Sequence, residues 1–453
     1  MRARWDLSLA GLVLFSSFMW LGVAGAYIGL SLVGIAFAHR WRDVARWAGN
    51  DWLVRIILFI LGYLLFRCIL GYLQNPESLY GQLELLGHQA EIWALVLPLA
   101  WAMRGRTNRV VLAWTLAGAG LVLLLWKNFD WNRYEVILFE ARRFGFHKSY
   151  LDYALFSSLT ALWLMVGARR YWYAFEKRSL RWFARAFWGV SLFTVLAAVV
   201  IIQSRSTWVA SLLVWPVAVG LRYRGHLSCL FQNRRRALAL LLLVCVVALP
   251  LGFSAAKAWQ QRWTGIDLPV RAVLSGDVDR VPLKGRDFSL GARIHVWALG
   301  LEKWRERPLL GWGSEATTFI GGLNNRVRRL EHYHSTPVQM AAQYGLLGVA
   351  LFITFFAVLW RRLVRVYREG KLPRDLFVFM VGAWAISLFW GVFDLAYYHA
   401  HGRFAVLLLC AGSCTLVLTS SARRESAAHR EGLEHVGGDM LSETGRGEVH
   451  LAW

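Results

Sequence analysis

Long apolar blocks, separated by short basic stretches, constrain this chain more than any other feature of its sequence. A bilayer core roughly 30 Å thick is crossed by about 20 apolar residues of α-helix. Only a helix or a closed barrel satisfies its backbone in lipid, and these blocks are too long and unbroken for barrel strands. They predict an all-α polytopic membrane protein with about twelve transmembrane helices, at residues 8–22, 25–38, 52–73, 85–103, 110–127, 150–168, 183–202, 207–221, 237–252, 338–360, 376–397 and 404–420.

The charge of the chain agrees with this topology. The sequence has 51 Lys and Arg against 28 Asp and Glu, a net charge of +23, which taken alone would fit nucleic-acid binding. More than half of the basic residues, however, fall in the segments that alternation places inside and in their flanks, most of them in short loops, as the positive-inside rule expects. Examples are Arg234–Arg236 and Arg361–Arg365. We therefore attribute the charge to topology, with the N-terminus inside, and expect no nucleic-acid partner.

The connections between these predicted helices divide the chain into four parts. Residues 1–252 contain the first nine helices, and residues 337–420 contain the last three. Residues 253–336 form the largest loop, which alternation places on the outward side. Residues 421–453 are polar and rich in Gly, Ser, Glu and Arg, which is typical of a mobile tail, here cytoplasmic.

The large loop is expected to be partly helical. At residues 289–306, apolar residues that include Trp297 recur at helical spacing, and Pro308 disfavours a helical conformation just before it. We expect this helix to lie along the membrane interface or to close over the spans. The stretch Thr336–Gln339 has the form of a capping box with Pro at the first helical position. His334 therefore lies just before the outward N-terminus of a membrane helix.

Outward arginines are the first candidates for a functional site. Arg205 lies in the shortest predicted hairpin, where the positive-inside rule makes an arginine unusual. The alternative is an interfacial side chain that extends to lipid headgroups. Arg293 lies near the apolar stripe of the loop helix, where a surface salt bridge with Asp287 or Glu302 is the alternative. Arg286, in a polar stretch, is a weaker candidate.

His334 is the candidate general base. The positive end of a helix dipole favours the neutral imidazole, which can accept a proton near pH 7. A helix-capping or interfacial role is the alternative. Because His332, His399 and His401 are also outward, a metal cluster is a further alternative, but the two His-x-His pairs lack helical ligand spacing.

Acidic residues offer one further candidate. Asp394 lies near the outward end of the span 376–397, and an acid at membrane depth is usually paired or functional. We expect Asp394 to hold an arginine or to orient His334. The stretch Asp277–Asp279 has the DxD form of some sugar-nucleotide transferases, yet a solvated loop explains it better. Arg67 lies deep in a predicted span, and the sequence assigns it no partner.

Three stretches together resemble the O-antigen ligase and O-antigen polymerase superfamily. The stretch Gln203–Trp208 is similar to the Ser-Arg motif of that family at a helix junction. The stretch Arg293–Gly313 is similar to its Arg-x-x-x-Trp motif, which is followed by a Pro-led glycine turn. His334-Ser335, followed by Tyr344–Gly348, is similar to its His-Ser and Gly-Leu-Leu-Gly entry into the membrane. The resemblance covers roughly residues 190–356 and depends on the order and spacing of the three stretches.

The resemblance implies a GT-C-like glycosyltransferase in the bacterial inner membrane with a periplasmic active site. Within the superfamily it favours the ligase, which moves O-antigen from undecaprenyl diphosphate to lipid A–core oligosaccharide. Arg205 and Arg293 would then bind the diphosphate and His334 would act as base, with no metal and no cofactor. Arg286, Asp394 and Trp297 are expected to help bind the substrate. Membrane lipid surrounds the reaction, because both the donor and the acceptor are lipid-linked.

Other functions stay open at this point. The O-antigen polymerases and the protein O-oligosaccharyltransferases share the three motifs. A transporter or flippase of a lipid-linked anion would also use outward arginines. Transporters, however, tend to show inverted repeats and broken helices near the midplane, whereas this sequence has no internal repeat and its candidates gather at the outward surface.

Overall fold

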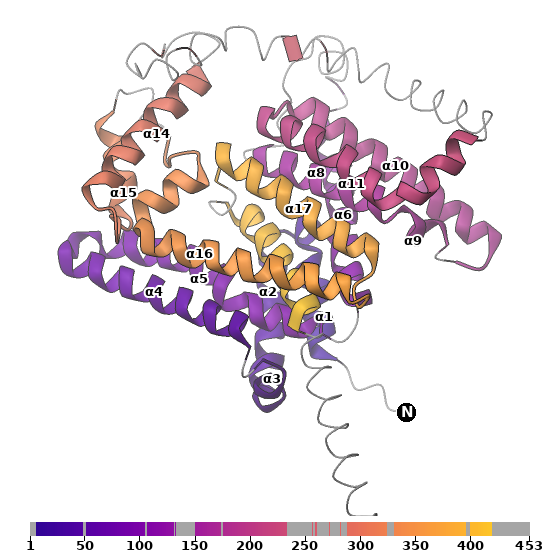
Figure 1. Cartoon of the computed structure of the whole chain (residues 1–453), viewed down its shortest axis with the longest axis horizontal. Coiled ribbons are helices and arrows are strands. Elements are labelled where there is room, and N and C mark those ends of the chain that lie inside the picture. The colour runs from indigo at the N-terminus through magenta and orange to yellow at the C-terminus, as the bar shows by residue number, and fades with distance from the viewer. Residues whose placement is uncertain are drawn as a thin grey trace, which may run out of the picture.

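The computed structural model describes residues 6–48, 51–104, 107–130, 132, 150–173, 175–232, 256, 259, 260, 271, 281, 288–323, 330–395 and 399–418. Within these ranges the regular elements are all helices (Figure 1). They are α1 (Leu7–Ser16), α2 (Phe18–His39), α3 (Trp41–Ala48), α4 (Trp52–Gln74), η1 (Pro76–Ser78), α5 (Leu79–Ala102), α6 (Thr107–Asn128), α8 (Tyr150–Val166), α9 (Ala168–Trp172), α10 (Arg178–Ile202), α11 (Arg205–Gln232), α14 (Phe288–Glu306), α15 (Glu315–Thr318), η5 (Phe319–Gly322), α16 (Thr336–Arg368) and α17 (Arg374–Phe393), followed by the helix Ala400–Leu418.

Many of these helices have the length and composition of membrane spans. In the described part of the chain, 7 helices qualify: α2, α4, α6, α10, α16, α17 and Ala400–Leu418. The prediction of an all-helical polytopic membrane protein is therefore confirmed. The predicted spans at 85–103, 150–168 and 207–221 overlap α5, α8 and α11, of which α5 begins earlier and α11 ends later than predicted. The predicted span at 237–252 lies outside the described residues.

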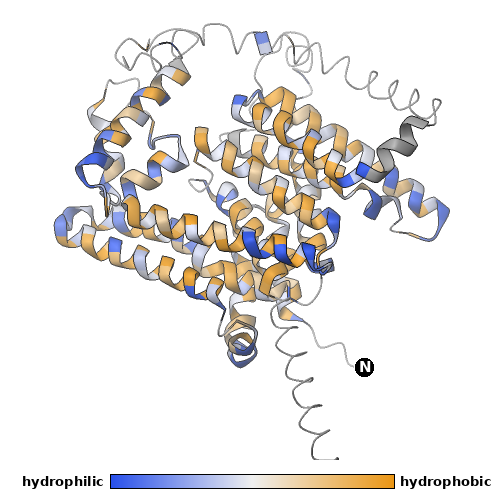
Figure 2. Ribbon diagram, viewed as in Figure 1, coloured by the Kyte–Doolittle hydropathy of each residue, from blue (hydrophilic) through white to orange (hydrophobic). Residues whose placement is uncertain are grey.

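The outer faces of the helices are apolar, as a lipid environment requires. Large side chains such as Phe59, Phe183 and Ile353 are 65%, 70% and 62% exposed. Figure 2 shows hydrophobic residues over most of the length of the helices, with hydrophilic residues concentrated at their ends. A soluble protein rarely exposes so much contiguous apolar surface, so these faces contact the bilayer.

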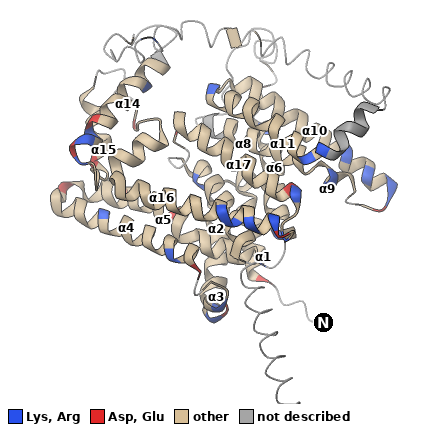
Figure 3. Cartoon of the chain, in the orientation of Figure 1, with Lys and Arg blue, Asp and Glu red and all other residues tan. Residues whose placement is uncertain are grey.

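Charged side chains are grouped by position along the helices. Figure 3 shows Lys and Arg gathered around α9, the start of α10 and the C-terminal end of α16, whereas beside α15 basic and acidic residues are mixed. At that end Arg170 pairs with Asp375 through two hydrogen bonds, which ties α9 to the start of α17. This distribution is the one that the positive-inside rule predicts for the cytoplasmic ends of membrane helices.

The first two predicted spans form a hairpin. Gly22 has a φ of 73°, so the chain leaves helical geometry there and turns back. A Cβ added to Gly29 would lie 2.3 Å from the backbone nitrogen of Phe15, which shows how closely the two arms approach. The turn at Gly22 agrees with the predicted boundary between residues 8–22 and 25–38.

A tight junction joins α16 to the turn that follows α14. Gly345 has a φ of 62° and interrupts α16, which leaves backbone groups without helical partners. The turn at 308–313 supplies them: the amides of Trp312 and Gly313 donate to carbonyls before the break at 2.8 and 2.9 Å. A Cβ on Gly345 would lie 2.3 Å from the carbonyl oxygen of Leu309, so only glycine fits there. The two glycine-rich stretches therefore hold each other.

Arg67 of α4 binds the same turn through its side chain. Its side chain is 1% exposed, and its Nε and Nη2 donate to the carbonyl oxygens of Leu310 and Gly311, each at 2.9 Å. A cation at membrane depth is costly without such partners. The predicted loop helix, which begins one residue earlier than expected at Phe288, is thereby held against α16.

Candidate functional site

Three of the predicted site residues meet just beyond the end of α17. Asp394 follows the helix in an extended conformation and is 4% exposed. One oxygen of its carboxylate lies 3.3 Å from Nδ1 of His334, and the other lies 3.5 Å from Nη2 of Arg293. His334 and Arg293 are 60 and 101 positions away in the sequence, so the fold alone brings them together. We call Asp394, His334 and Arg293 the Asp394 cluster.

The surroundings of Asp394 keep its carboxylate ionised. Burial would raise the pKa of Asp394, but the hydrogen bond with His334 and the charge of Arg293 outweigh burial and lower the pKa below its usual value. The backbone amide of Leu395 also donates to this carboxylate, at 2.9 Å. Because an ionised carboxylate only accepts hydrogen bonds, Nδ1 of His334 is the donor, and Nε2 is left as an acceptor.

Thr336 connects Asp394 to the start of α16. Its amide and its hydroxyl both donate to the carbonyl oxygen of Asp394, at 3.2 and 3.0 Å. The predicted capping box is wrong, because Ser335 is the N-cap and Thr336 is already helical. The side chain of Gln339 accepts from the amide of Tyr333 at 3.0 Å and does not reach the N-cap amide. Both polar side chains make tertiary contacts that position the cluster.

The backbone of His334 is held in an unusual conformation. Its φ is 47°, in the left-handed region that few residues other than glycine adopt. The indole of Trp297 donates to the carbonyl oxygen of His334 at 3.4 Å, and its ring packs 6.2 Å from that of Phe393. Trp297, expected to bind substrate, therefore lies against the backbone of the candidate base. Strain of this kind is typical of functional sites.

His332 supports His334 from the other side. The two rings lie 4.0 Å apart, and Nδ1 of His332 accepts the backbone amide of His334 at 3.1 Å. Burial, with smaller effects from His334 and Arg293 among its neighbours, lowers the pKa of His332 to about 3. His332 is therefore neutral at physiological pH, which its role as an acceptor requires.

The depressed pKa of His332 predicts a loss of stability in acid. Because an unfolded histidine titrates near pH 6.5, the unfolded state takes up the proton first as the pH falls. The contribution of neutral His332 to the free energy of unfolding is therefore complete above pH 6.5. It is lost progressively as the pH falls toward about 3, the pKa of His332 in the folded protein. Between pH 7 and 5 this group should remove about 2 kcal/mol of unfolding free energy. Thermal unfolding in detergent should be less acid-sensitive in His332→Asn, whose Oδ1 can still accept the amide. Equal acid sensitivity in the two proteins would contradict the assignment.

Arg205 is the first residue of α11, just after Gln203, which has a left-handed φ of 54°. The helices α11 and α17 run antiparallel, and the guanidinium of Arg374 at the start of α17 donates to the carbonyl oxygen of Leu221. An α-helix rises about 1.5 Å per residue, so the distance along each helix from this contact can be compared. Arg205 on α11 and the last residue of α17 lie at nearly the same distance from it, on the same side of the contact. The structure thus joins Arg293 and His334 through Asp394 and positions Arg205 at the same end, on a neighbouring helix.

A metal could be considered at the cluster. In the described part of the chain, His332, His334 and Asp394 each offer a ligand atom, and these atoms lie within 4.8 Å of one another. In the observed arrangement, however, Nδ1 of His332 accepts an amide, and the Asp394 carboxylate is already shared by His334 and Arg293. The guanidinium of Arg293 also opposes a cation at this point. The donor set therefore fits a hydrogen-bonded cluster better than a metal centre.

Chelation tests this interpretation. Treatment of the purified protein with EDTA should leave the glycan transfer that the motif resemblance implies unchanged, because Arg293 already balances the charge of the Asp394 carboxylate. Loss of activity that a divalent cation restores would contradict it and would assign His332, His334 and Asp394 as ligands. An inactive protein that no cation restores would indicate damage by the treatment, which a matched measurement of thermal unfolding detects.

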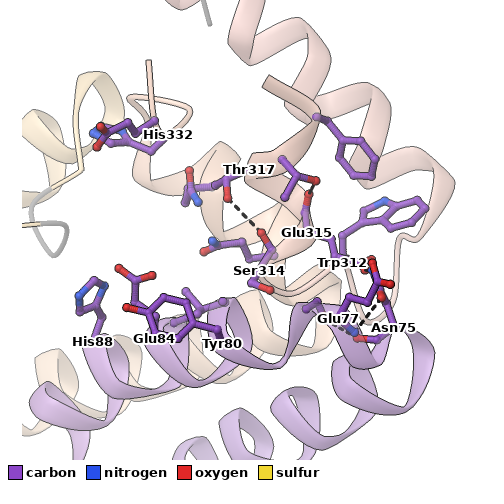
Figure 4. Close-up of a pocket in the computed structure, with 18 of the residues that line it drawn as sticks. Asn75, Glu77, Tyr80, Glu84, His88, Trp312, Ser314, Glu315, Thr317 and His332 are labelled. Atoms are coloured by element: carbon purple, nitrogen blue, oxygen red, sulfur yellow. Dashed lines mark hydrogen bonds between the residues drawn. The ribbon is translucent and has the colours of Figure 1, made fainter. Parts of the chain in front are cut away.

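Two cavities flank the Asp394 cluster. A groove of about 500 Å³ has almost wholly apolar walls from α5, α16 and α17, and Thr336 and Pro337 line its end. A second cavity of about 710 Å³ lies between α5, the turn after α14 and the loop that carries His332 (Figure 4). We call these the apolar groove and the polar pocket. Leu395 and His332 line the polar pocket, so the cluster lies between the two.

Some predicted residues cannot be placed. Arg286, Asp287 and Asp277–Asp279 lie outside the described residues. The metal-capable group found among the described residues does not include His399 or His401. The polar pocket itself was missed, because its acidic residues are scattered between α5 and the large loop and form no local motif.

Comparison with known proteins supports the sequence interpretation of this region. The profile of the O-antigen ligase family matches residues 190–353, which contain Arg205, Arg293 and His334 together with both glycine-rich stretches. This segment is therefore similar to the O-antigen ligase family. Members of this superfamily act on lipid-linked polysaccharides and are glycosyltransferase-like ligases and polymerases. The predicted resemblance is therefore confirmed, and the matched residues agree with the region of roughly 190–356 expected from the three motifs.

Similarity to a curated relative extends beyond residues 190–353. The chain is 25% identical over 415 residues to the exopolysaccharide production protein ExoQ of Rhizobium meliloti strain 1021. The alignment covers 86% of this chain and 82% of ExoQ. The likeness therefore extends beyond the matched segment 190–353 and includes α5, which lines the polar pocket.

Proposed function

We propose that this chain is a glycosyltransferase that moves polysaccharide from undecaprenyl diphosphate to lipid A–core oligosaccharide at the periplasmic face of the bacterial inner membrane. In this proposal the chain has about twelve spans in a GT-C-like arrangement, and residues 253–336 form the periplasmic loop over the reaction site. The tail at 421–453 is cytoplasmic.

One observation carries the proposal: the Asp394 cluster lies between an apolar groove and a polar pocket. A polyprenyl chain needs an apolar surface that opens toward lipid, and the walls of the groove match that chemistry. A glycan needs a cavity with hydrogen-bonding walls, which the polar pocket has. The bond that is broken joins these two kinds of molecule, so it must lie where the two cavities approach each other.

The cluster then supplies the base. Nε2 of His334 takes the proton of an acceptor hydroxyl, and the freed oxygen attacks the anomeric carbon of the donor sugar. Asp394 accepts the hydrogen bond from Nδ1, fixes the ring and stabilises the imidazolium that forms, as the carboxylate does in catalytic triads. The side chain of His334 is 17% exposed, so it is not fully buried, and its neighbours His332 and Thr336 line the polar pocket and the apolar groove. In-line attack inverts the anomeric centre.

Arginines supply the complementary charge. The bond between the anomeric carbon and the diphosphate oxygen breaks, and the electron pair leaves with the diphosphate. Among the residues that the structure describes, Arg293 contacts Asp394 through Nη2 at 3.5 Å, and its guanidinium has five N–H donors with which to bind phosphate oxygens as well. Arg205, at the same end of the neighbouring helix, adds a second positive charge that stabilises the negative charge of the departing diphosphate.

Polymerisation is the second candidate. The similarity to an exopolysaccharide production protein favours it, because the acceptor would then be a second lipid-linked glycan. The chemistry at His334 is the same in both cases. Only the molecule that enters the polar pocket differs.

A reconstituted assay separates these functions. Purified protein in vesicles receives polyprenyl-diphosphate glycan together with lipid A–core oligosaccharide or a second carrier-linked glycan. Transfer to lipid A–core supports the ligase, and extension of the carrier-linked glycan supports the polymerase. Movement of intact donor across the vesicle membrane, with neither product formed, would refute both and support a transporter.

A further inference from the structure

The polar pocket has the size and position of a binding site for a small molecule. Its volume of about 710 Å³ lies within the range of roughly 300–1,000 Å³ typical of small-molecule sites. One wall is α5, and the facing walls are the stretch 312–319 and the loop that carries His332 (Figure 4). It is therefore large enough for a few sugar units and lies next to the candidate base.

The charge of the pocket is opposite to that of the chain. Four carboxylates line it, and no Lys or Arg is found among its lining residues: the acidic members are Glu77, Glu84, Glu315 and Glu331. The whole chain has a net charge of +23, so this concentration of negative charge is local. Figure 4 shows Glu84 and His88 on α5 across the cavity from His332. Such walls repel phosphates and carboxylates and attract cations.

Gln343 provides an independent indication of a ligand. It lines the pocket and is 3% exposed, and its Oε1 accepts no hydrogen bond from the residues that the structure describes. An unsatisfied buried acceptor costs about 1–3 kcal/mol, so a donor from a bound molecule would relieve that cost. Together with the carboxylates, Gln343 makes the pocket rich in acceptors, which matches a ligand rich in O–H or N–H donors.

Aromatic residues complete the walls. Trp312 packs edge-on against Phe319 with ring centroids 5.0 Å apart, and its indole donates to the carbonyl oxygen of Lys303 at 2.8 Å. Tyr80 on the opposite wall is 81% exposed. Aromatic rings offer flat apolar surfaces of the kind against which the C–H faces of sugar rings stack. Acceptor oxygens beside such surfaces suit a saccharide better than an isolated cation.

We propose that the polar pocket is a saccharide site selective for neutral or amine-bearing sugars and closed to anionic ones. That the pocket holds the acceptor of the reaction rests on the proposed function. Its selectivity for the charge of the sugar follows from its own lining residues and does not rest on that function. The arginines near the Asp394 cluster favour the diphosphate, whereas the pocket excludes it. Opposite charges on the two sides would thus prevent the donor headgroup from occupying the acceptor side.

Binding of three disaccharides tests the selectivity without any donor. Full-length protein in lipid nanodiscs is titrated at mildly acidic pH by saturation-transfer NMR. The ligands are the disaccharide of glucosamine, which is cationic, that of N-acetylglucosamine, which is neutral, and digalacturonate, which is anionic. We expect the cationic sugar to bind about tenfold more tightly than the neutral one, and no saturable binding of digalacturonate.

Isosteric variants locate the effect. Glu84→Gln and, separately, Glu331→Gln should reduce the preference for the cationic over the neutral sugar to about threefold or less. Glu302→Gln, on the exposed face of α14, is the matched control and should leave it unchanged. Equal binding of digalacturonate, no binding of any sugar, or an unchanged preference in both variants would overturn the proposal. Transfer activity that persists alongside such a result would refute the pocket alone and leave the proposed function standing.

Discussion

His334→Ala should lower the rate of glycan transfer by about 10²–10⁴-fold, the usual contribution of a positioned general base. The acceptor hydroxyl would then have no group to take its proton as it attacks. Insertion and thermal stability should change little, because Asp394 would keep its pairing with Arg293 and the amide of Leu395. Initial rates with saturating acceptor measure the effect, which should fall on kcat.

His295→Ala is the matched control. It removes another half-buried histidine from the same loop, on α14, whose Nε2 lies 3.3 Å from the carbonyl oxygen of Val281. Its transfer rate should stay within a few-fold of the unmodified protein. Normal transfer in His334→Ala would refute the assignment of His334 as the base. An equal loss of transfer in both variants would show that the substitutions disrupt the loop and do not remove a specific catalytic group.

Arg205→Lys should lower the transfer rate by about 10²-fold although it keeps the positive charge. A diphosphate presents pairs of oxygens that a planar guanidinium binds through two parallel hydrogen bonds, whereas an ammonium binds as a point charge. A lipid-anchoring arginine, the alternative role, would tolerate lysine. Rates measured with the same donor separate these two roles.

Arg224→Lys is the appropriate comparison for that variant. Arg224 is exposed on the same helix, α11, toward its other end. Its substitution therefore measures the effect of an Arg→Lys change on this helix away from the outward site. It should transfer glycan at the normal rate. Full activity in Arg205→Lys would mean that Arg205 serves the membrane interface and that Arg293 binds the diphosphate without it.

The fold class and the main helices were predictable because hydropathy and helix signals are local. The loop helix at 289–306 differs from α14 by one residue at its start, and the turn at Gly22 lies between two predicted spans. The capping box failed for a physical reason: Thr336 donates its hydroxyl to the carbonyl of Asp394, a tertiary partner that no local pattern contains.

The candidate site was predictable only in part. Asp394, Arg293 and His334 each stood out by residue type and position, but their mutual contacts span 60 and 101 positions. Arg67 could not be assigned because its partners are backbone carbonyls, which every residue possesses. The polar pocket escaped notice because α5 and the loop contribute its carboxylates separately.

The release of polyprenyl diphosphate from a glycan-linked donor, measured with purified protein, tests the central claim most directly. The proposed mechanism predicts release that requires an acceptor, equals the amount of glycosylated product and disappears in His334→Ala. Release without acceptor at the same rate, or donor that is bound and moved across the membrane but never cleaved, would contradict it.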